Sequence, residues 1–245
     1  MMGKVLMSGI VPPLVAPVTG ILAGDLAVGS SVYLMENSVA AEYLVVNQGI
    51  PSGSSLYDVS CDGLWLLRKN IYEERQWHSS NTSDYANSTI HAYLNNAFLG
   101  LFGTVEQSVI KQVRIPYVNG AGASAVASGA NGLSTKIFLL SGYEVGFTQS
   151  IDSRFPIDGA KLSYFDDGIT DTSAKDKRVA TYDNTARDWY LRSPYGYTTA
   201  RMWMVSNTGT NSWSNPTYEF GVRPALILPS NALFDEKTLI LKGVK

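Results

Sequence analysis

The clearest pattern in the sequence is an apolar stripe with the period of an α-helix, between Ser83 and Gly103. Apolar residues recur there at i, i+3, i+4, i+7, i+8 and i+11, which puts them on one helical face. These residues are Ile90, Tyr93, Leu94, Ala97, Phe98 and Leu101. Asn87 or Ser88 can cap the start, and Gly103 can end the helix. The sequence therefore predicts a helix over residues 86–101 whose Ile90, Leu94 and Phe98 side chains pack on a sheet.

Most of the remaining chain carries short strand patterns between long polar loops. Thr104 and Gln107 form a capping-box pattern ahead of "SVIKQV", which predicts a second, shorter helix that "RIPYV" ends. Residues 31–49 predict two strands around a polar turn near Glu36–Ser38, and residues 63–77 begin as a buried strand. Further strands are predicted within residues 136–147 and at "WYLRS", "RMWMVS" and "GVRPALIL". Two early helices, short antiparallel strands and long loops together predict an α+β fold.

The N-terminal 25 residues differ from the rest of the chain. They are apolar, rich in Pro and Gly, nearly free of charge, and show no period of 2 or 3.6. Pro12, Pro13 and Pro17 would break a membrane-spanning helix. Such a segment either lines its own domain or docks on another subunit, and we expect the second. The predicted organisation is an apolar arm, residues 1–25, followed by one domain, residues 26–245.

The composition argues against several classes of function. Charged residues make up 16% of the chain, the net charge is −2, and no long basic run occurs. A nucleic-acid partner is therefore not expected, because a face that follows phosphates needs clustered Lys and Arg. Cys61 is the single cysteine, which excludes an internal disulfide and a zinc cluster. We expect it to be a buried, inert thiol.

Residues suited to catalysis are few. His78 and His91 are the only histidines, and no G-x-S-x-G nucleophile motif is present. The neighbouring carboxylates Glu73–Glu74 and Asp166–Asp167 lie in polar runs that are typical of solvated surface. The run "DDGITD", residues 166–171, has some character of a calcium loop but lacks the spacing of an EF-hand. No metal and no cofactor are expected.

The segment Tyr195–Tyr218 combines aromatic rings with hydroxyl and amide side chains, and it carries almost no charge. This composition is typical of binding surfaces, because aromatic rings give contact area at low entropic cost and amides give adaptable hydrogen bonds. Met202 and Met204 alternate with Trp203, so we expect the methionines to face the core and Trp203 to face solvent. An ordinary β-rich core with polar loops is the alternative. The predicted ligand-binding residues are Tyr195, Tyr197, Thr198, Arg201, Trp203, Asn207, Asn211, Trp213, Asn215 and Tyr218.

Arg192 and Arg223 each lie within an apolar strand pattern next to a proline. A guanidinium group in such a place needs a counter-charge or backbone carbonyls as partners. We expect both arginines to hold strand ends and loops together, with ligand contact as the alternative.

The motifs at the ends of the last third resemble a known domain family. "WYLRSP", residues 189–194, and "GVRPAL", residues 221–226, are similar to the "WWLRSP" and "GVRPAL" motifs of a bacterial and phage family of unassigned biochemistry. Tyr190 stands in place of the second Trp of that motif. The stretches "RQWHSSNTSDYANSTIHAYLN" and "KIFLLSGYEVG" also resemble this family, so the resemblance covers roughly residues 30–230.

The resembled family looks related to the C-type lectin-like fold, which formylglycine-generating enzymes share with variable phage receptor-binding proteins. The resemblance implies a C-type lectin-like domain in a phage or prophage virion protein of a tail tip, tail fibre or capsid fibre, assembled in the bacterial cytoplasm. Formylglycine-generating enzymes work through paired cysteines, so this chain, with Cys61 alone, is not expected to share that activity.

Three functions are open at this point. The first, which we expect, is a non-enzymatic virion protein that binds a host-surface glycan or protein. Its residues 1–25 would contact other virion subunits, and the chain would form a homo-oligomer without membrane insertion. The second is a purely structural capsid or tail decoration subunit without a ligand. The third is an enzyme that acts on cell-wall glycan, which would need converging carboxylates in a cleft.

Overall fold

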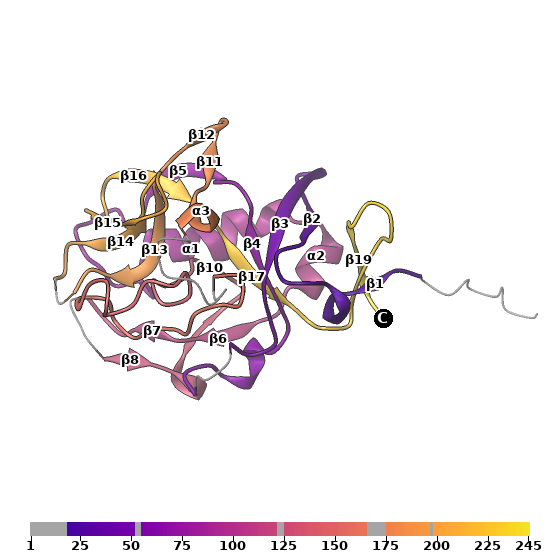
Figure 1. The fold of residues 1–245 in the computed structure, drawn as a ribbon, viewed down its shortest axis with the longest axis horizontal. Coiled ribbons are helices and arrows are strands. Elements are labelled where there is room, and N and C mark those ends of the chain that lie inside the picture. The colour runs from indigo at the N-terminus through magenta and orange to yellow at the C-terminus, as the bar shows by residue number, and fades with distance from the viewer. Residues whose placement is uncertain (1–18, 52–54, 122–124, 166–174, 197) are drawn as a thin grey trace, which may run out of the picture.

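A computed structural model of the chain describes residues 19–51, 55–121, 125–165, 175–196 and 198–245. Strands dominate this part of the chain and the helices are few and short, so the predicted α+β class is confirmed (Figure 1). Buried side chains from both large sheets belong to one continuous hydrophobic cluster, which includes Val32, Trp65, Trp189 and Ile227. Within the described ranges, no helix is both long and apolar enough to cross a membrane.

The first large sheet has the strand order β10-β17-β4-β3-β2, and every pairing in it is antiparallel. The turn between β2 and β3 consists of Asn37 and Ser38, whose φ angles of 48° and 65° suit a tight hairpin turn. The hairpin that the sequence predicts over residues 31–49 is therefore confirmed. The strands are β2 (Ser31–Glu36), β3 (Val39–Gln48), β4 (Leu64–Arg68), β10 (Ile137–Phe138) and β17 (Ala225–Leu228).

The second large sheet has the order β15-β14-β13-β16-β5 and places β15 and β5 at its two edges. β13 and β16 run parallel, with Trp189 opposite Gly221, and the other pairs are antiparallel. Gly221 is required at this crossing, because a Cβ there would lie 2.8 Å from the carbonyl oxygen of Asp188. The strands are β5 (Glu73–Gln76), β13 (Trp189–Pro194), β14 (Met202–Val205), β15 (Asn211–Ser214) and β16 (Glu219–Val222).

Smaller elements complete the fold around the two sheets. The three-stranded sheet β1-β18-β19 consists of β1 (Ile21–Leu22), β18 (Ala232–Phe234) and β19 (Leu241–Val244). The two-stranded pairs are β6 (Val113–Ile115) with β9 (Leu133–Thr135), β7 (Tyr117–Val118) with β8 (Val126–Ala127), and β11 (Thr181–Tyr182) with β12 (Thr185–Ala186). The short helical turns are η1 (Ala23–Asp25), η2 (Val59–Cys61), η5 (Gly129–Asn131) and α3 (Lys175–Arg178).

The end of the predicted N-terminal arm contacts its own chain. β1 pairs with β18, and the backbone N–H of Gly24 donates a hydrogen bond to the carbonyl of Ser230. Ala23 is completely buried. Both ends of the domain therefore meet in one small sheet, beside the β2–β3 hairpin (Figure 1). Residues 1–18 lie outside the described residues, and their contact with another subunit stays a prediction.

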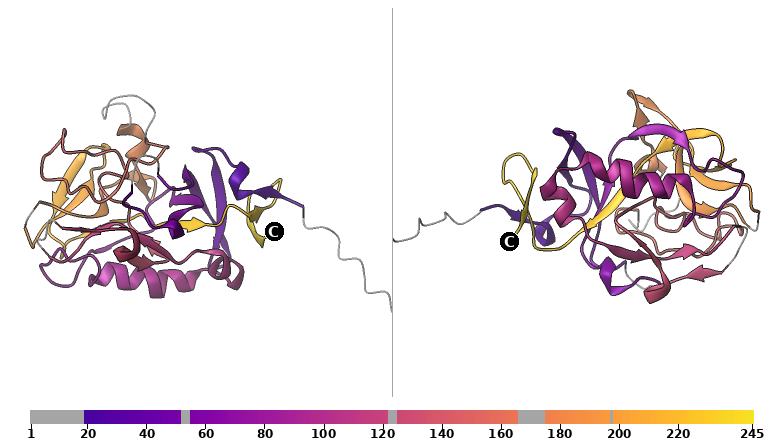
Figure 2. Two further views of the ribbon diagram at one scale, coloured as in Figure 1. Left: turned by 90° about the horizontal axis from the view of Figure 1, so that it is seen from below. Right: turned by 180° about the vertical axis from the view of Figure 1, so that it is seen from behind.

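The predicted helix forms, and the centre of its apolar stripe is buried, whereas Ala97, which the sequence placed on the stripe, is exposed. It begins as α1 (Thr89–Tyr93), widens into the π-helical turn η3 (Leu94–Phe98) and ends as the 3-10 turn η4 (Leu99–Leu101). The Ser88 side chain caps its start by accepting a hydrogen bond from the N–H of His91. Ile90, Leu94 and Phe98 are fully buried, as predicted. The helix runs along the back of the molecule and contacts β5 of one sheet and β10 of the other (Figure 2).

The second helix also forms, as α2 (Thr104–Val109), but it covers only the start of "SVIKQV", since β6 begins at Val113, and the predicted capping box does not form. Gly103 is the residue at its N-cap, and Thr104 is already helical, so its side chain makes no cap bond. The side-chain amide of Gln107 instead donates to the carbonyl of Phe102. The sequence pattern was wrong by one position, because the apolar residue Phe102 is buried and fixes where the chain turns.

Replacing Leu94 by Ala should destabilise the fold by about 2–5 kcal/mol, since it leaves a cavity between the helix and the sheets. The measurement is the free energy of unfolding from urea denaturation. Ala97→Ser is the matched control, because Ala97 is exposed on the same helix and should change stability by no more than about 0.5 kcal/mol. Equal effects of the two substitutions would contradict the packing of the stripe.

Candidate functional site

The predicted binding residues fall on β14, β15 and the three connections around them. Trp213, on the edge strand β15, is exposed to 44%, and Tyr218, just before β16, to 62%. They are the only aromatic side chains among the large hydrophobic residues that are exposed in the described part of the chain. Tyr197 lies outside the described residues. The two exposed rings therefore both belong to the segment that the sequence singled out.

A row of aromatic rings leads from the interior to Trp213. Phe155 stacks on Trp203 with ring centroids 3.8 Å apart, and Phe147 stacks on Phe155 at 5.5 Å. Tyr195 contacts Trp203 at 4.6 Å and Trp213 at 5.2 Å. Every ring of the row except Trp213 is buried. The row thus holds the one exposed indole on a rigid base.

The expected exposure of Trp203 and Tyr195 is wrong, because they are 1% and 5% exposed. The methionines of β14 do face the interior, yet Trp203 on the opposite face is covered by Phe155. This phenylalanine comes from residues 139–165, which form no helix or strand. Both faces of β14 are therefore covered, so the alternation of residues along this strand does not identify a face that is exposed to solvent.

Two arginines contact the outer rings of the row. The guanidinium carbon of Arg201 lies 3.9 Å from the ring centroid of Trp213 and 5.8 Å from that of Tyr195. The guanidinium carbon of Arg154 lies 4.5 Å from the Tyr195 centroid. Both arginines are exposed. We call the group of Trp213, Tyr195, Arg201 and Arg154 the aromatic–arginine patch; Arg154 was missed at the sequence level, because nothing in its local sequence links it to the segment.

The other predicted polar residues mainly shape the loops around the patch. The Asn215 side-chain oxygen accepts hydrogen bonds from the backbone N–H and the hydroxyl of Thr217. The Thr198 hydroxyl donates to the carbonyl of Tyr195. Asn207 and Asn211 lie at the turn that joins β14 to β15, with Asn207 exposed and Asn211 half-buried. Part of the polar composition of this segment is thus explained by turn structure.

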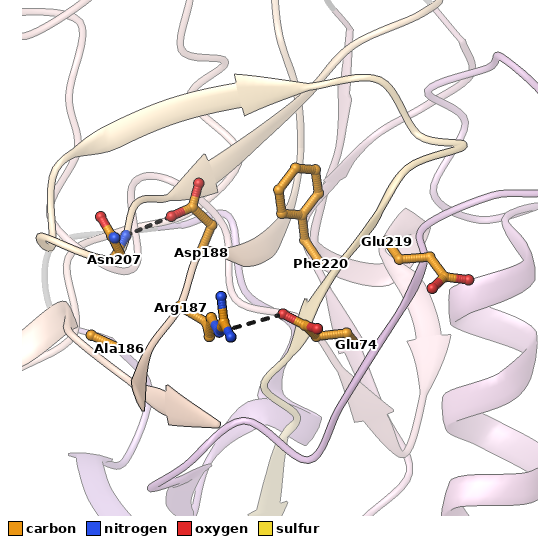
Figure 3. A pocket seen from close by; sticks show the side chains of 7 residues that line it. All are labelled: Glu74, Ala186, Arg187, Asp188, Asn207, Glu219 and Phe220. Carbon is orange, nitrogen blue, oxygen red and sulfur yellow. Dashed lines mark hydrogen bonds and ion pairs between the residues drawn. The ribbon is translucent and has the colours of Figure 1, made fainter. Parts of the chain in front are cut away.

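A polar pocket of about 270 Å³ lies at the opposite end of the same strands (Figure 3). Asp188 accepts a hydrogen bond from the backbone N–H of Asn207 at 2.7 Å, and Arg187 approaches Glu74 at 4.0 Å. The residues that line it are Glu74, Ala186, Arg187, Asp188, Asn207, Glu219 and Phe220. The sequence predicted a solvated surface for Glu74, and did not indicate that Arg187 would be its neighbour.

Arg192 is buried and all five of its N–H groups are bonded. Its Nη1 and Nη2 donate to the two carboxylate oxygens of Glu144 at 2.6 and 2.7 Å. The remaining donors reach the carbonyls of Pro116, Leu139 and Asp158 at 2.9–3.0 Å. Glu144 also accepts from the hydroxyl of Tyr57 at 2.9 Å. The geometry agrees with the expected structural role, because no part of this guanidinium can reach a ligand from solvent.

Arg223 is equally buried, but no carboxylate of the described residues pairs with it. Its Nε donates to the carbonyl of Arg68 at 2.9 Å, and its guanidinium carbon lies 4.9 Å from the Trp189 ring. Burial lowers the pKa of Arg223 to about 10, since it penalises the charged form. Arg223 lies between β16 and β17 and links this junction to the end of β4 and to the start of β13.

Asp158 borders the Arg192 cluster and is fully buried. One of its carboxylate oxygens accepts a hydrogen bond from the Ser193 hydroxyl at 2.7 Å, whereas the other has no partner among the described residues. Burial raises the pKa of Asp158 to about 6, and the neighbouring Arg192 only partly opposes this. Its carboxyl group cannot contact a substrate, because solvent does not reach it.

The remaining candidates for chemistry are also internal. Cys61 is buried, as expected, and burial raises the pKa of its thiol to about 12. His91 is mostly buried, which lowers its pKa. In the described ranges no group of three or more His, Cys, Asp or Glu side chains is arranged to hold a metal ion. The calcium-like run at residues 166–171 lies outside those ranges.

Comparison with known proteins gives one family. Its model, described as a domain of unknown function (DUF6273), matches residues 62–230, which begin just before β4 and end just after β17. No curated protein and no solved structure matches the chain. The matched range contains Arg192, Glu144, Arg223 and the whole aromatic–arginine patch.

Replacing Arg192 by Ala should destabilise the protein by about 3–5 kcal/mol, because it leaves Glu144 buried without a counter-charge. Urea denaturation monitored by Trp fluorescence measures this loss. Arg187→Ala is the control, since Arg187 is exposed and makes only a loose ion pair. A loss below about 1 kcal/mol for Arg192→Ala would show that the cluster does not stabilise the fold.

Asp158→Asn should change the pH dependence of stability. The pKa of the Asp158 carboxyl group is about 6 in the folded protein and about 3.9 in the unfolded chain. The folded state therefore holds more protons between these values, and stability falls as pH rises from about 4 to about 6. Asn cannot ionise, so the variant does not lose this stability. The difference in the free energy of unfolding, variant minus wild type, should therefore rise by about 2 kcal/mol between pH 4 and pH 7.5. Denaturation of both proteins at the two pH values tests this, and a constant difference would contradict it.

Proposed function

The chain belongs to the DUF6273 family, and we propose that it is a non-enzymatic virion protein whose lectin-like domain binds a host-surface glycan or protein. The observation that carries the proposal is Trp213, an indole exposed to 44% on an edge strand, held from behind by buried rings. Such a ring binds with little loss of conformational freedom, because its orientation is fixed before the ligand arrives. Attachment needs contact area and hydrogen bonds rather than a reactive group.

The proposed C-type lectin-like fold is supported by the layout of the matched region. β4 and β17, its first and last strands, pair side by side and bring the two ends of the region together. Between them, long segments such as residues 139–165 lack helices and strands and are held by side-chain bonds. Loops fixed on a rigid scaffold commonly carry binding residues.

The proposed position in a tail tip, tail fibre or capsid fibre rests on the resemblance and on the apolar N-terminal sequence. β1 fixes the chain at Ile21 and Leu22, so the residues before it start from an ordered base on the domain. We propose that they contact other virion subunits within a homo-oligomer.

A purely structural decoration subunit is the second candidate, and one observation favours it. An apolar depression of about 280 Å³ lies beside the β2–β3 hairpin, where Val39 is exposed to 68%. Exposed apolar surface of this kind often marks a contact between proteins. An enzyme that acts on cell-wall glycan is not proposed. Asp158 and Glu144 are buried, and two of the three carboxylates that line the polar pocket already have partners: Glu74 approaches Arg187, and Asp188 accepts a hydrogen bond from the backbone N–H of Asn207.

Trp213→Ala should weaken adsorption to host cells by about 2 kcal/mol or more, if Trp213 is the central contact. Its effect on the melting temperature should be small, because nearly half of the side chain is exposed. Both quantities are measured on the purified full chain, with Trp213→Tyr as the variant that keeps an aromatic ring and most of the binding. If Trp213→Ala lowered the melting temperature and left adsorption unchanged, the structural subunit would be the better proposal.

A further inference from the structure

We propose that the aromatic–arginine patch binds an anionic glycan, whose sugar ring stacks on Trp213 and whose carboxylate or phosphate group is bound by Arg201 and Arg154. This inference rests on the proposed function, since it names the ligand of the same surface. Four features carry it: the free charge of Arg201, the fixed position of Arg154, the exposed indole, and the polar surroundings.

Arg201 is an exposed cation without a counter-charge. No carboxylate in the described ranges forms an ion pair with it, whereas Arg68, Arg75, Arg154, Arg187 and Arg192 each have one. Its guanidinium lies against Trp213 at 3.9 Å, which orients it and leaves N–H groups at its edge for an acceptor. A carboxylate or phosphate can occupy these donors in a bidentate geometry.

Arg154 supplies a second, fixed guanidinium. Its Nε donates to Asp152 at 2.7 Å and its Nη2 donates to the other oxygen of the same carboxylate. No hydrogen bond joins its Nη1 to a carboxylate of the described residues. Both arginines lie against the Tyr195 ring, with their guanidinium carbons 4.5 and 5.8 Å from its centroid. The two arginines and Asp152, the side chains in contact here, together carry a net positive charge. The area therefore attracts an anion.

The rest of the patch suits a sugar rather than a nucleic acid. Trp213 keeps 44% of its surface exposed even though the Arg201 guanidinium lies over its ring. Asn211 and Ser212 precede it on the same strand and bring an amide and a hydroxyl group. Proteins that bind single-stranded nucleic acid need a basic groove that follows many phosphates. The aromatic–arginine patch contains two arginines, which fits a ligand that carries its charge next to a sugar ring.

The test is binding of the purified full chain to four polymers, measured by calorimetry at low and high ionic strength. They are a poly(glycerol phosphate) teichoic acid that carries glucosyl substituents, an oligogalacturonate, neutral dextran and oligo(dT). We expect the phosphate polymer, the carboxylate polymer or both to bind at least about tenfold more tightly than dextran. Binding should weaken by about tenfold between 0.05 and 0.5 M salt, because the charges are exposed. The first two polymers distinguish a phosphate from a carboxylate.

Arg201→Gln should reduce binding of the preferred polymer by about tenfold or more. Arg75→Gln is the matched control, with the same change of charge. Arg75 also stacks on a ring, that of Tyr93 at 3.7 Å, but on β5 at the far edge of the same sheet. Arg75→Gln should change the affinity for the preferred polymer by no more than about twofold, because salt screens the effect of a distant charge.

Several outcomes would overturn the inference and leave the proposed function standing. They are equal binding of dextran, tighter binding of oligo(dT), no effect of Arg201→Gln, or no polymer binding while adsorption to cells still depends on Trp213. If neither polymers nor cells bound the protein, the proposed function would fail together with the inference.

Discussion

The ion pair between Arg192 and Glu144 is the interaction on which the rest of the structure depends. It joins the "LRSP" strand to the "LSGYE" turn, and the five N–H groups of Arg192 reach acceptors on four residues: Pro116, Leu139, Glu144 and Asp158. Ser193, the next residue, accepts a hydrogen bond from the backbone N–H of Gly142 and donates one to Asp158. Removing either partner of a buried charge pair leaves the other charge unpaired in the interior, which strongly destabilises the fold. Two sequence motifs that are distant in the chain are therefore parts of one cluster.

This cluster explains how a long segment without regular structure becomes an ordered layer. Residues 139–165 form no helix or strand, yet Phe155 in this segment stacks on Trp203 and covers one face of β14. With the segment held at Glu144 and Asp158, the aromatic row has a fixed order and only Trp213 remains exposed at its end. The exposure of the candidate site is thus set by polar bonds in the interior, far along the chain from the site.

The sequence predicts the parts of the fold that local periodicity controls. The stripe of Ile90, Leu94 and Phe98 and the Asn37–Ser38 turn form as predicted, because a helical period and a hairpin turn are encoded within a few residues. The burial of Trp203 could not be predicted, because alternation along β14 assumes one solvent face, and the covering Phe155 is 48 residues away with no period of its own. Arg154 was missed for the same reason. The aromatic content of the segment did locate Trp213 and Tyr218.

Arginine has three different roles in this chain, and its surroundings decide between them. Arg192 is buried against a carboxylate and serves as a cross-link. Arg223 is buried against carbonyls and the Trp189 ring, and the resulting penalty on its charge lowers its pKa to about 10. Arg201 is exposed, oriented by Trp213, and unneutralised by any carboxylate of the described residues. A charge that is already satisfied inside the fold can contribute only to stability, whereas an oriented charge at the surface still has its donors free for a ligand.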